Sequence, residues 1–305
     1  MKFPLIGNER IKRNISLMVQ NNKIPHAIIL EGENGLGKKT LAKFLAKAFL
    51  CKNENAPCDN CKSCHLACVG SHPDLMHLTP EGVNYAIDQI RNLKTEAFLS
   101  PMMCDGRVFI IDFADSMTPY CQNALLQVLE EPPQRVCFIL LCQNASSLLQ
   151  TIRSRCVPFT LSPVPIESEG IEKLKTLISD SEKDAAALLA ATDGNIGKAV
   201  IFSENDDLPE QVAHKVMLYA SEGNKLKILE SMQPFVKKRD ALLSLITELK
   251  NILSKEMQKK AVKEYSSFTY KKLLNAYERL KEIEVELPLN PSVLLVFCII
   301  ADILT

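Results

Sequence analysis

A glycine-rich loop between an apolar run and an amphipathic helix is the feature that most constrains how this chain can fold. The apolar run His26–Leu30 leads into Gly32-Glu33-Asn34-Gly35-Leu36-Gly37-Lys38, and a helical pattern over 40–50 follows. A strand, a loop of this spacing and a helix together form a Walker A phosphate-binding element. The glycines let backbone N–H groups close around phosphate, the lysine reaches the terminal phosphates, and the helix N-terminus favours the anion. The sequence therefore predicts a domain of the nucleotide-binding type.

The residues that should hold Mg²⁺ and activate water depart from the usual pattern. Lys39 stands where the motif has a Ser or Thr hydroxyl for Mg²⁺. Thr40 comes one residue later, about 100° further around a helix, and is a poor substitute. A second apolar run ends in Asp112, a Walker B aspartate, but Phe113 replaces the water-orienting glutamate usual in ATPases. The sequence leaves room for ATP or ADP binding and predicts no hydrolysis. The residues assigned to this degenerate site are Gly32, Gly35, Gly37, Lys38, Lys39, Thr40 and Asp112.

Apolar runs alternate with helical segments through the first half of the chain. Unbroken apolar runs at Arg107–Asp112, Val136–Cys142 and Val157–Thr160 are typical of strands buried on both faces. The segment Tyr120–Glu131 has a helical pattern and is stopped by two prolines. This alternation predicts an α/β fold with a parallel sheet covered on both faces.

The strand pattern fades after residue 162. The segments 162–165 and 168–170 are expected to be linkers, because they are rich in Ser, Pro and Gly. The rest of the chain has a helical pattern, and its last helix is expected to start near Asn290, with Pro291 in the first turn.

Charge, apolar runs and cysteine content limit the functions and the cellular location that we expect for this chain. Lys plus Arg equals Asp plus Glu, 36 each, which argues against tight autonomous DNA binding because that binding depends on a basic excess. The first residues lack the apolar stretch of a secretory signal, and the longest apolar run, Val293–Ile300, is too short to span a bilayer. Eleven cysteines without such a signal indicate a reducing compartment, so the cytoplasm is expected.

Four closely spaced cysteines predict a structural metal site. Cys51, Cys58, Cys61 and Cys64 have the spacing C-x6-C-x2-C-x2-C, and four thiolates suit tetrahedral Zn²⁺ with no open position for catalysis. The site would lie in an insertion after the Walker A helix.

Two alternatives to zinc remain open. Cys58, Cys61, Cys64 and Cys68 have the spacing of an iron–sulfur run, although Val69 stands where that run has proline. The cysteines are also compatible with free thiols that hold no metal. His65 and His72 are further candidate ligands, which Cys51 makes unnecessary.

Several stretches in residues 5–160 together resemble bacterial clamp-loader subunits of the AAA+ superfamily. The stretches are Ile6-Gly7-Asn8-Glu9, Pro25-His26-Ala27, His72-Pro73-Asp74-Leu75, Ile90-Arg91-Asn92-Leu93, Gly106–Asp112, Asn123–Pro133 and Ser154-Arg155-Cys156. The resemblance implies an AAA+ P-loop parallel-sheet domain over 1–162 with a zinc module at about 51–68. It further implies a small helical lid domain over 163–205 and an all-α collar domain over 206–305.

Within this family, the departures from the Walker motifs indicate the kind of subunit. The gamma/tau ATPase subunits have Gly-Lys-Thr, Asp-Glu and a second-sensor arginine, whereas the delta-prime kind has degenerate versions. Lys39 and Phe113 are two such losses, and Gly197 stands at the sensor arginine, with Lys198 as a partial substitute. The sequence is therefore similar to the delta-prime kind of the DNA polymerase III clamp loader. The alternatives are an active gamma/tau-type ATPase, an iron–sulfur regulator and a nucleotide kinase.

The resemblance also implies a role for the Ser154-Arg155-Cys156 motif. In this family Arg155 would face ATP bound by the adjacent gamma/tau subunit and act on it in trans during DNA replication. The implied partners are the gamma/tau and delta subunits in a hetero-pentamer, the sliding clamp and primer–template DNA. The implied ligands of the chain itself are structural Zn²⁺ and, without hydrolysis, ATP or ADP. Gln143 or Asn144 stands where AAA+ proteins carry a first sensor. Without the rest of the site, its expected role is limited to capping the next helix.

Overall fold

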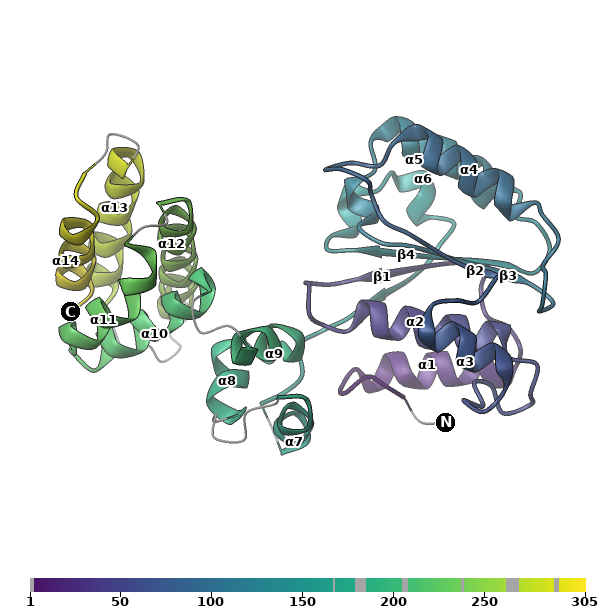
Figure 1. Ribbon diagram of the computed structural model, residues 1–305, viewed down its shortest axis with the longest axis horizontal. Helices are drawn as coiled ribbons and strands as arrows, with labels where there is room; N and C mark the ends of the chain where they lie inside the picture. The colour runs from purple at the N-terminus through teal and green to yellow at the C-terminus, as the bar shows by residue number, and fades with distance from the viewer. Residues whose placement is uncertain are drawn as a thin grey trace. The chain divides into compact units, whose positions relative to one another are not determined.

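The computed structural model describes residues 3–166, 168–178, 185–204, 208–236, 239–261, 269–287 and 291–305. The chain divides into two compact units, Met1–Val200 and Ile201–Thr305, and each is described here by itself. The first unit combines a sheet with helices and the second is helical (Figure 1).

The first unit is built on a five-stranded parallel sheet with the order β2-β3-β4-β1-β5. Its strands are β1 (Ala27–Glu31), β2 (Leu75–Leu78), β3 (Arg107–Ile111), β4 (Val136–Cys142) and β5 (Val157–Thr160). This confirms the predicted α/β fold with a parallel sheet. The sequence did not predict β2, because it is a short edge strand whose residues are only partly buried.

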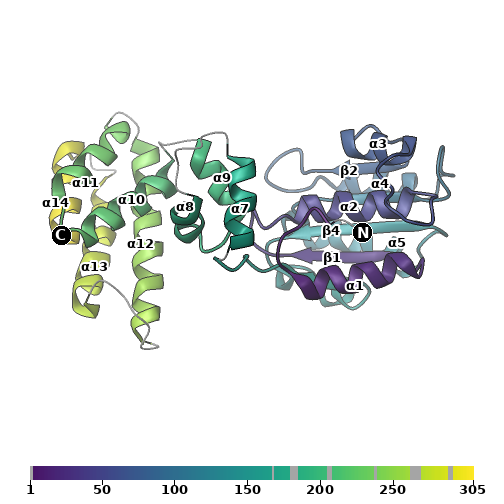
Figure 2. The same cartoon turned by 90° about the horizontal axis from the view of Figure 1, so that it is seen from below.

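Helices cover both faces of the sheet, which explains why its central strands are apolar except for Arg107 and Glu31 at strand ends. One face carries α1 (Glu9–Gln20), α2 (Lys38–Leu50) and α3 (Lys62–Val69), and the other carries α4 (Ile87–Ala97), α5 (Pro119–Glu130) and α6 (Gln150–Arg153) (Figures 1 and 2). In β1, Ile28 and Leu30 belong to the core under α1 and α2, whereas Ala27 and Ile29 belong to the core under α4 and α5. A strand that packs against apolar side chains on both faces of the sheet does not alternate apolar and polar residues.

Three short helices complete the first unit. They are α7 (Ser168–Leu177), α8 (Ala185–Ala191) and the first half of α9 (Ile196–Glu204), whose residues from Ile201 on belong to the second unit. Their small core contains Leu174, Leu189 and Ala199. The expected linker at 168–170 is therefore wrong, because this segment is the start of α7. Gly170 serves close packing there: a Cβ on it would lie 3.1 Å from Leu189 Cδ2.

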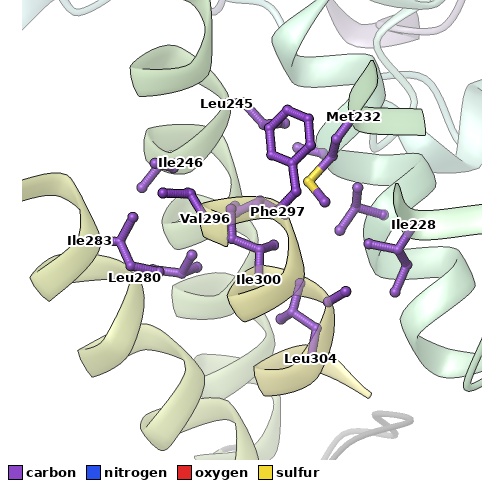
Figure 3. Packing of buried hydrophobic residues seen from close by; sticks show 14 of the residues in the cluster. Ile228, Met232, Leu245, Ile246, Leu280, Ile283, Val296, Phe297, Ile300 and Leu304 are labelled. Atoms are coloured by element: carbon purple, nitrogen blue, oxygen red, sulfur yellow. The ribbon is translucent and has the colours of Figure 1, made fainter. Parts of the chain in front are cut away.

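The second unit packs helices around one apolar core. Its helices are α10 (Pro209–Ser221), α11 (Lys225–Met232), α12 (Arg239–Ala261), α13 (Tyr270–Glu286) and α14 (Val293–Leu304). Leu245, Leu280, Phe297 and Ile300 meet in this core (Figure 3). The last helix begins at Val293, so Pro291 precedes it rather than lying in its first turn; Asn290 is outside the described residues.

The three-domain division with boundaries at 162/163 and 205/206 stays a prediction. In the described residues no single helix is long and apolar enough to cross a membrane; α8 and Ile196–Ser203 pass that test only as a pair, bent by 119°.

Asp74 joins the segment before β2 to the loop before β3. Its carboxylate is 1 % exposed and accepts hydrogen bonds from the backbone N–H groups of Met102, Met103 and Cys104 at 2.6, 2.8 and 2.7 Å. Burial alone would raise the pKa of Asp74, but these three donors outweigh it, and the pKa lies below its usual value.

We expect Asp74→Asn to lower the free energy of unfolding at pH 7 by about 2–3 kcal/mol, because hydrogen bonds to a buried charge are lost. A carboxylate with a lowered folded-state pKa stabilises above its unfolded pKa of about 3.9, and this stability is lost as pH falls through the folded pKa. The gap between wild type and variant, measured by urea unfolding, should therefore narrow below pH ~4. Asp88→Asn, at an exposed site, should cost under about 1 kcal/mol. A gap that is constant with pH would contradict this role.

Candidate functional site

The Walker A lysine is bonded to its own loop. Lys38 is the first residue of α2, and its Nζ donates to the carbonyl oxygens of Gly32 and Glu33 at 2.5 and 2.9 Å. The side chain is buried, and burial lowers the pKa of Lys38. Gly35 and Gly37 have φ values of +93° and +90°, which only glycine adopts readily. The loop thus has the expected backbone shape, while its ammonium group contacts loop carbonyls.

Lys39 supplies the positive charge beside the Walker B aspartate. Its Nζ lies 2.6 Å from Asp112 Oδ2 and 5.3 Å from the centroid of the Phe113 ring. This contact is an ion pair, because Asp112 Oδ2 has no hydrogen-bond partner among the described residues. The Asp112 side chain is only 4 % exposed, so it depends on a nearby cation. The carboxylate that would help to hold Mg²⁺ in an ATPase is thus paired with an ammonium group of the same chain.

Thr40 does not replace the missing hydroxyl. It lines a cavity of about 280 Å³ together with Gly35, Gly37 and residues of the N-terminal segment and of α9. Asp112 does not line that cavity. Thr40 and the aspartate with which it would have to share Mg²⁺ therefore do not line the same cavity.

Residues at the start of α9 lie directly on the phosphate loop. The Gly197 N–H donates to Gly35 O at 3.1 Å, and Asn195 Nδ2 donates to Asn34 O at 2.8 Å. A Cβ on Gly197 would lie 2.5 Å from Gly35 Cα, so this approach requires glycine. Gly197, at the position expected for a sensor arginine, thus contacts the phosphate loop through its backbone. Asn195, which the sequence analysis did not single out, is 2 % exposed.

The other three candidate sensor residues have local partners. Lys198, a partial substitute for the sensor arginine, pairs with Glu33 Oε2 at 3.2 Å. Asn144 Oδ1 accepts from Ser146 N–H at 2.8 Å and so caps a short 3₁₀ helix, Ala145–Ser147. Gln143 N–H donates to Asp115 Oδ2 at 2.8 Å. Lys198 and Asn144 thus each have a local side-chain partner, whereas the contact of Gln143 is made by its backbone.

The structure brings together the four cysteines predicted to bind zinc. The Sγ atoms of Cys51, Cys58, Cys61 and Cys64 all lie within 4.8 Å of one another, and those of Cys51 and Cys61 are 4.0 Å apart. Four sulfurs at the usual zinc distance would be about 3.8 Å apart, so this quartet fits a tetrahedral ion. Among the described residues, Cys68 is exposed and adds no ligand atom to this group, which disfavours the iron–sulfur quartet.

Helix ends position the cysteines of this quartet. Cys51 directly follows α2 as its C-cap, and Cys61 caps the start of α3 by accepting from Cys64 N–H at 3.4 Å. Hydrogen bonds from the Asn60 backbone and the Asn53 side chain lower the pKa of the Cys58 thiol to about 6. This thiol is largely deprotonated at neutral pH, as a metal ligand must be. Burial raises the pKa values of Cys51 and Cys64 instead, so binding of an ion would have to displace their protons. His65 lies outside the quartet, and His72 belongs to a separate buried group with Asp74 and Cys104.

Arg155 lies at the surface between α6 and β5. Its Nη2 is 2.8 Å from Glu130 Oε1, and its Nη1 donates to Thr151 O at 2.9 Å and to Ser154 Oγ at 3.4 Å. The side chain is 36 % exposed, whereas Cys156 beside it is buried. Glu130, the last residue of α5, was not recognised from sequence as a partner.

The strand order, the glycine-rich loop before α2 and the helices against that loop define an AAA+ fold. In its nucleotide site, Lys39 and Phe113 stand where the motifs have the Mg²⁺-binding hydroxyl and the glutamate. A family model described as "DNA polymerase III, delta subunit" matches residues 7–165, more than half of the chain, and the chain belongs to this family. These findings confirm the resemblance inferred from sequence.

Relatives with known names agree with this assignment. The chain is 35 % identical over 214 residues to the DNA polymerase III subunit delta' of Bacillus subtilis, covering 69 % of this chain and 63 % of the relative. It is 34 % identical over 181 residues to that of Haemophilus influenzae, covering 59 % and 54 %. The matches therefore span less than two thirds of each relative's length.

A solved structure supports the fold. The DNA polymerase III gamma subunit-related protein of Thermotoga maritima superposes with a TM-score of 0.52 at 18 % identity, covering 95 % of this chain and 98 % of that one.

We expect Lys39→Thr to destabilise the first unit by about 1–2 kcal/mol, because it leaves Asp112 buried without its cation. Half-exposure of Lys39 keeps the loss below that of a fully buried pair. Lys39→Arg should be milder because it keeps the charge, and Lys43→Thr, one turn further along the same helix, should be close to neutral. Urea unfolding at pH 7 measures all three variants. Equal stability of Lys39→Thr and wild type would show that Asp112 does not depend on this ammonium.

Proposed function

We propose that this chain is a delta-prime-type subunit of the DNA polymerase III clamp loader that assists ATP hydrolysis by a neighbour. One observation carries the proposal: Lys39 neutralises the Walker B aspartate of its own pocket, while Arg155 keeps a surface position. Membership of the family and the similarity to delta' of Bacillus subtilis support it. A pocket without Mg²⁺ ligation and without a catalytic glutamate has no means of its own to hydrolyse ATP.

The contacts of Arg155 are compatible with a role in trans. Its pair with Glu130 is partly exposed on both sides, and such pairs are worth about 0–1 kcal/mol. Exchanging Glu130 for phosphate oxygens would therefore cost little. The guanidinium carries a permanent charge and a planar fork suited to those oxygens. In GTPases an arginine supplied in this way accelerates hydrolysis by roughly 10³–10⁵.

The remaining parts of the proposal concern assembly. The partners would be gamma/tau and delta subunits in a hetero-pentamer, acting in the cytoplasm on the sliding clamp and primer–template DNA. The helical second unit would supply the collar contacts. Zinc held by the cysteine quartet would be structural, since four protein thiolates leave no position for substrate.

We expect Arg155→Ala to slow clamp loading by at least about tenfold in a loader reconstituted with gamma/tau and delta, because one ATP site loses its arginine. DNA- and clamp-stimulated ATP turnover and clamp loading are the measurements, with gel filtration to verify assembly. Arg153→Ala, an exposed neighbour, should behave as wild type. Glu130→Gln should also retain activity, because Glu130 pairs with the Arg155 side chain only while that side chain does not contact ATP. Wild-type rates with Arg155→Ala would overturn the role in trans.

We expect the purified chain to be colourless and to contain about one zinc per molecule. Cys58→Ser should reduce the zinc content to less than half and lower the melting temperature, because a quartet ligand is lost. Cys68→Ser, a nearby exposed cysteine outside the quartet, should bind zinc as wild type does. Elemental analysis and visible absorption provide the readout. A brown protein containing iron and sulfide, or equal losses in both variants, would refute the zinc assignment.

A further inference from the structure

A buried polar network lies next to the cysteine quartet, at the end of α2. The carbonyl oxygen of Leu50, the residue before the ligand Cys51, accepts hydrogen bonds from Ser63 Oγ and from Cys104 Sγ, both at 3.1 Å. The last carbonyls of a helix have no partner within that helix. Ser63 and Cys104, which lie on two separate segments, both supply hydrogen-bond donors to the Leu50 carbonyl.

His72 orients the hydroxyl of Ser63. Its Nδ1 accepts from Asp74 N–H at 3.0 Å, so the ring proton lies on Nε2. That Nε2 is 2.9 Å from Ser63 Oγ and 3.4 Å from Cys104 Sγ. His72 therefore donates to the Ser63 oxygen, which leaves the Ser63 proton to bond Leu50 O. The side chains of Ser63, His72 and Cys104 are all buried, so each bond is shielded from water. We call Leu50 O, Ser63, His72 and Cys104 the Leu50 network.

This group is better explained as a hydrogen-bond network than as a second metal site. His72, Asp74 and Cys104 place ligand atoms within 4.8 Å of one another. Both Asp74 oxygens already accept backbone N–H groups, and His72 Nδ1 does so too. Only His72 Nε2 and Cys104 Sγ would remain for an ion, fewer than the three or four protein ligands that a zinc site uses.

We propose that the Leu50 network positions the zinc ligands and slows the loss of the ion. Ser63 lies between Cys61 and Cys64 in sequence, and Leu50 directly precedes Cys51. The bond from Ser63 to Leu50 O therefore joins the two segments that carry these ligands, without involving the ion. His72 and Cys104 connect this bond to the body of the domain.

The proposal rests on zinc binding by the quartet, which is itself proposed above. Contacts that orient metal ligands typically change metal affinity by about 10–100-fold when removed. We expect a change near the lower end, about tenfold, because all four thiolates remain.

The test is the rate at which zinc leaves the full-length, zinc-loaded chain in excess 4-(2-pyridylazo)resorcinol, which absorbs visibly when it binds zinc. Ser63→Ala removes the hydroxyl group that bonds to Leu50 O. His72→Ala removes the Nε2–H group that donates to that hydroxyl oxygen. Both should release zinc about tenfold faster than wild type. His72→Gln places an amide nitrogen near the position of Nε2 and should restore most of the retention. Ser71→Ala, at an exposed serine of the same segment, should match wild type.

Thermal unfolding of each variant and the spectrum of its cobalt form separate positioning from general loss of structure. The expected result is fast zinc release from variants that still fold and still show four-thiolate cobalt absorption. Wild-type release rates from folded Ser63→Ala and His72→Ala would overturn the proposal. If His72→Ala does not fold, Ser63→Ala decides alone. A wild-type chain that holds no zinc would instead refute the zinc assignment.

Discussion

The ion pair between Lys39 and Asp112 is the constraint on which the nucleotide pocket depends. In an ATPase the charge beside this aspartate arrives with Mg²⁺ and nucleotide and leaves with the product. Here it belongs to the chain and lies 2.6 Å from the carboxylate. The cation beside Asp112 is therefore present without a bound ligand. The Gly197–Gly35 contact likewise holds the start of α9 on the phosphate loop through groups of the chain itself.

Much of the first unit could be predicted because its signals are local. Val136–Cys142 is apolar throughout since β4 is buried on both faces, and the glycine-rich loop has one fitting context, between a strand and a helix. The cysteine spacing likewise indicated a quartet that the structure brings together. The error at 168–170 arose because Gly170 looks like a turn residue, whereas its small size serves packing against α8.

Other parts of the site depend on contacts between residues far apart in sequence. Asn195 and Asn34 are 161 positions apart, and no local pattern indicates their hydrogen bond. Gly197 could be recognised as a lost arginine, but its contact with Gly35 could not. Glu130 belongs to a stretch singled out for family resemblance, yet its pair with Arg155 depends on how α5 and α6 pack. Sequence thus indicated which groups were lost and not which contacts replaced them.

Both ends of α2 show the same physical solution. Lys38 and Lys39 stand in its first turn, where the helix dipole favours anions and disfavours cations. The carbonyls of Gly32 and Glu33 and the carboxylate of Asp112 offset that cost. At the other end, residues 51–68, all of which the structure describes, bury only Ala56, Cys64 and Ala67 as apolar side chains. So small a core cannot hold a module in place. The Leu50 network therefore ties this module to the end of α2. At the start of the same helix, the two lysines contact the phosphate loop and Asp112.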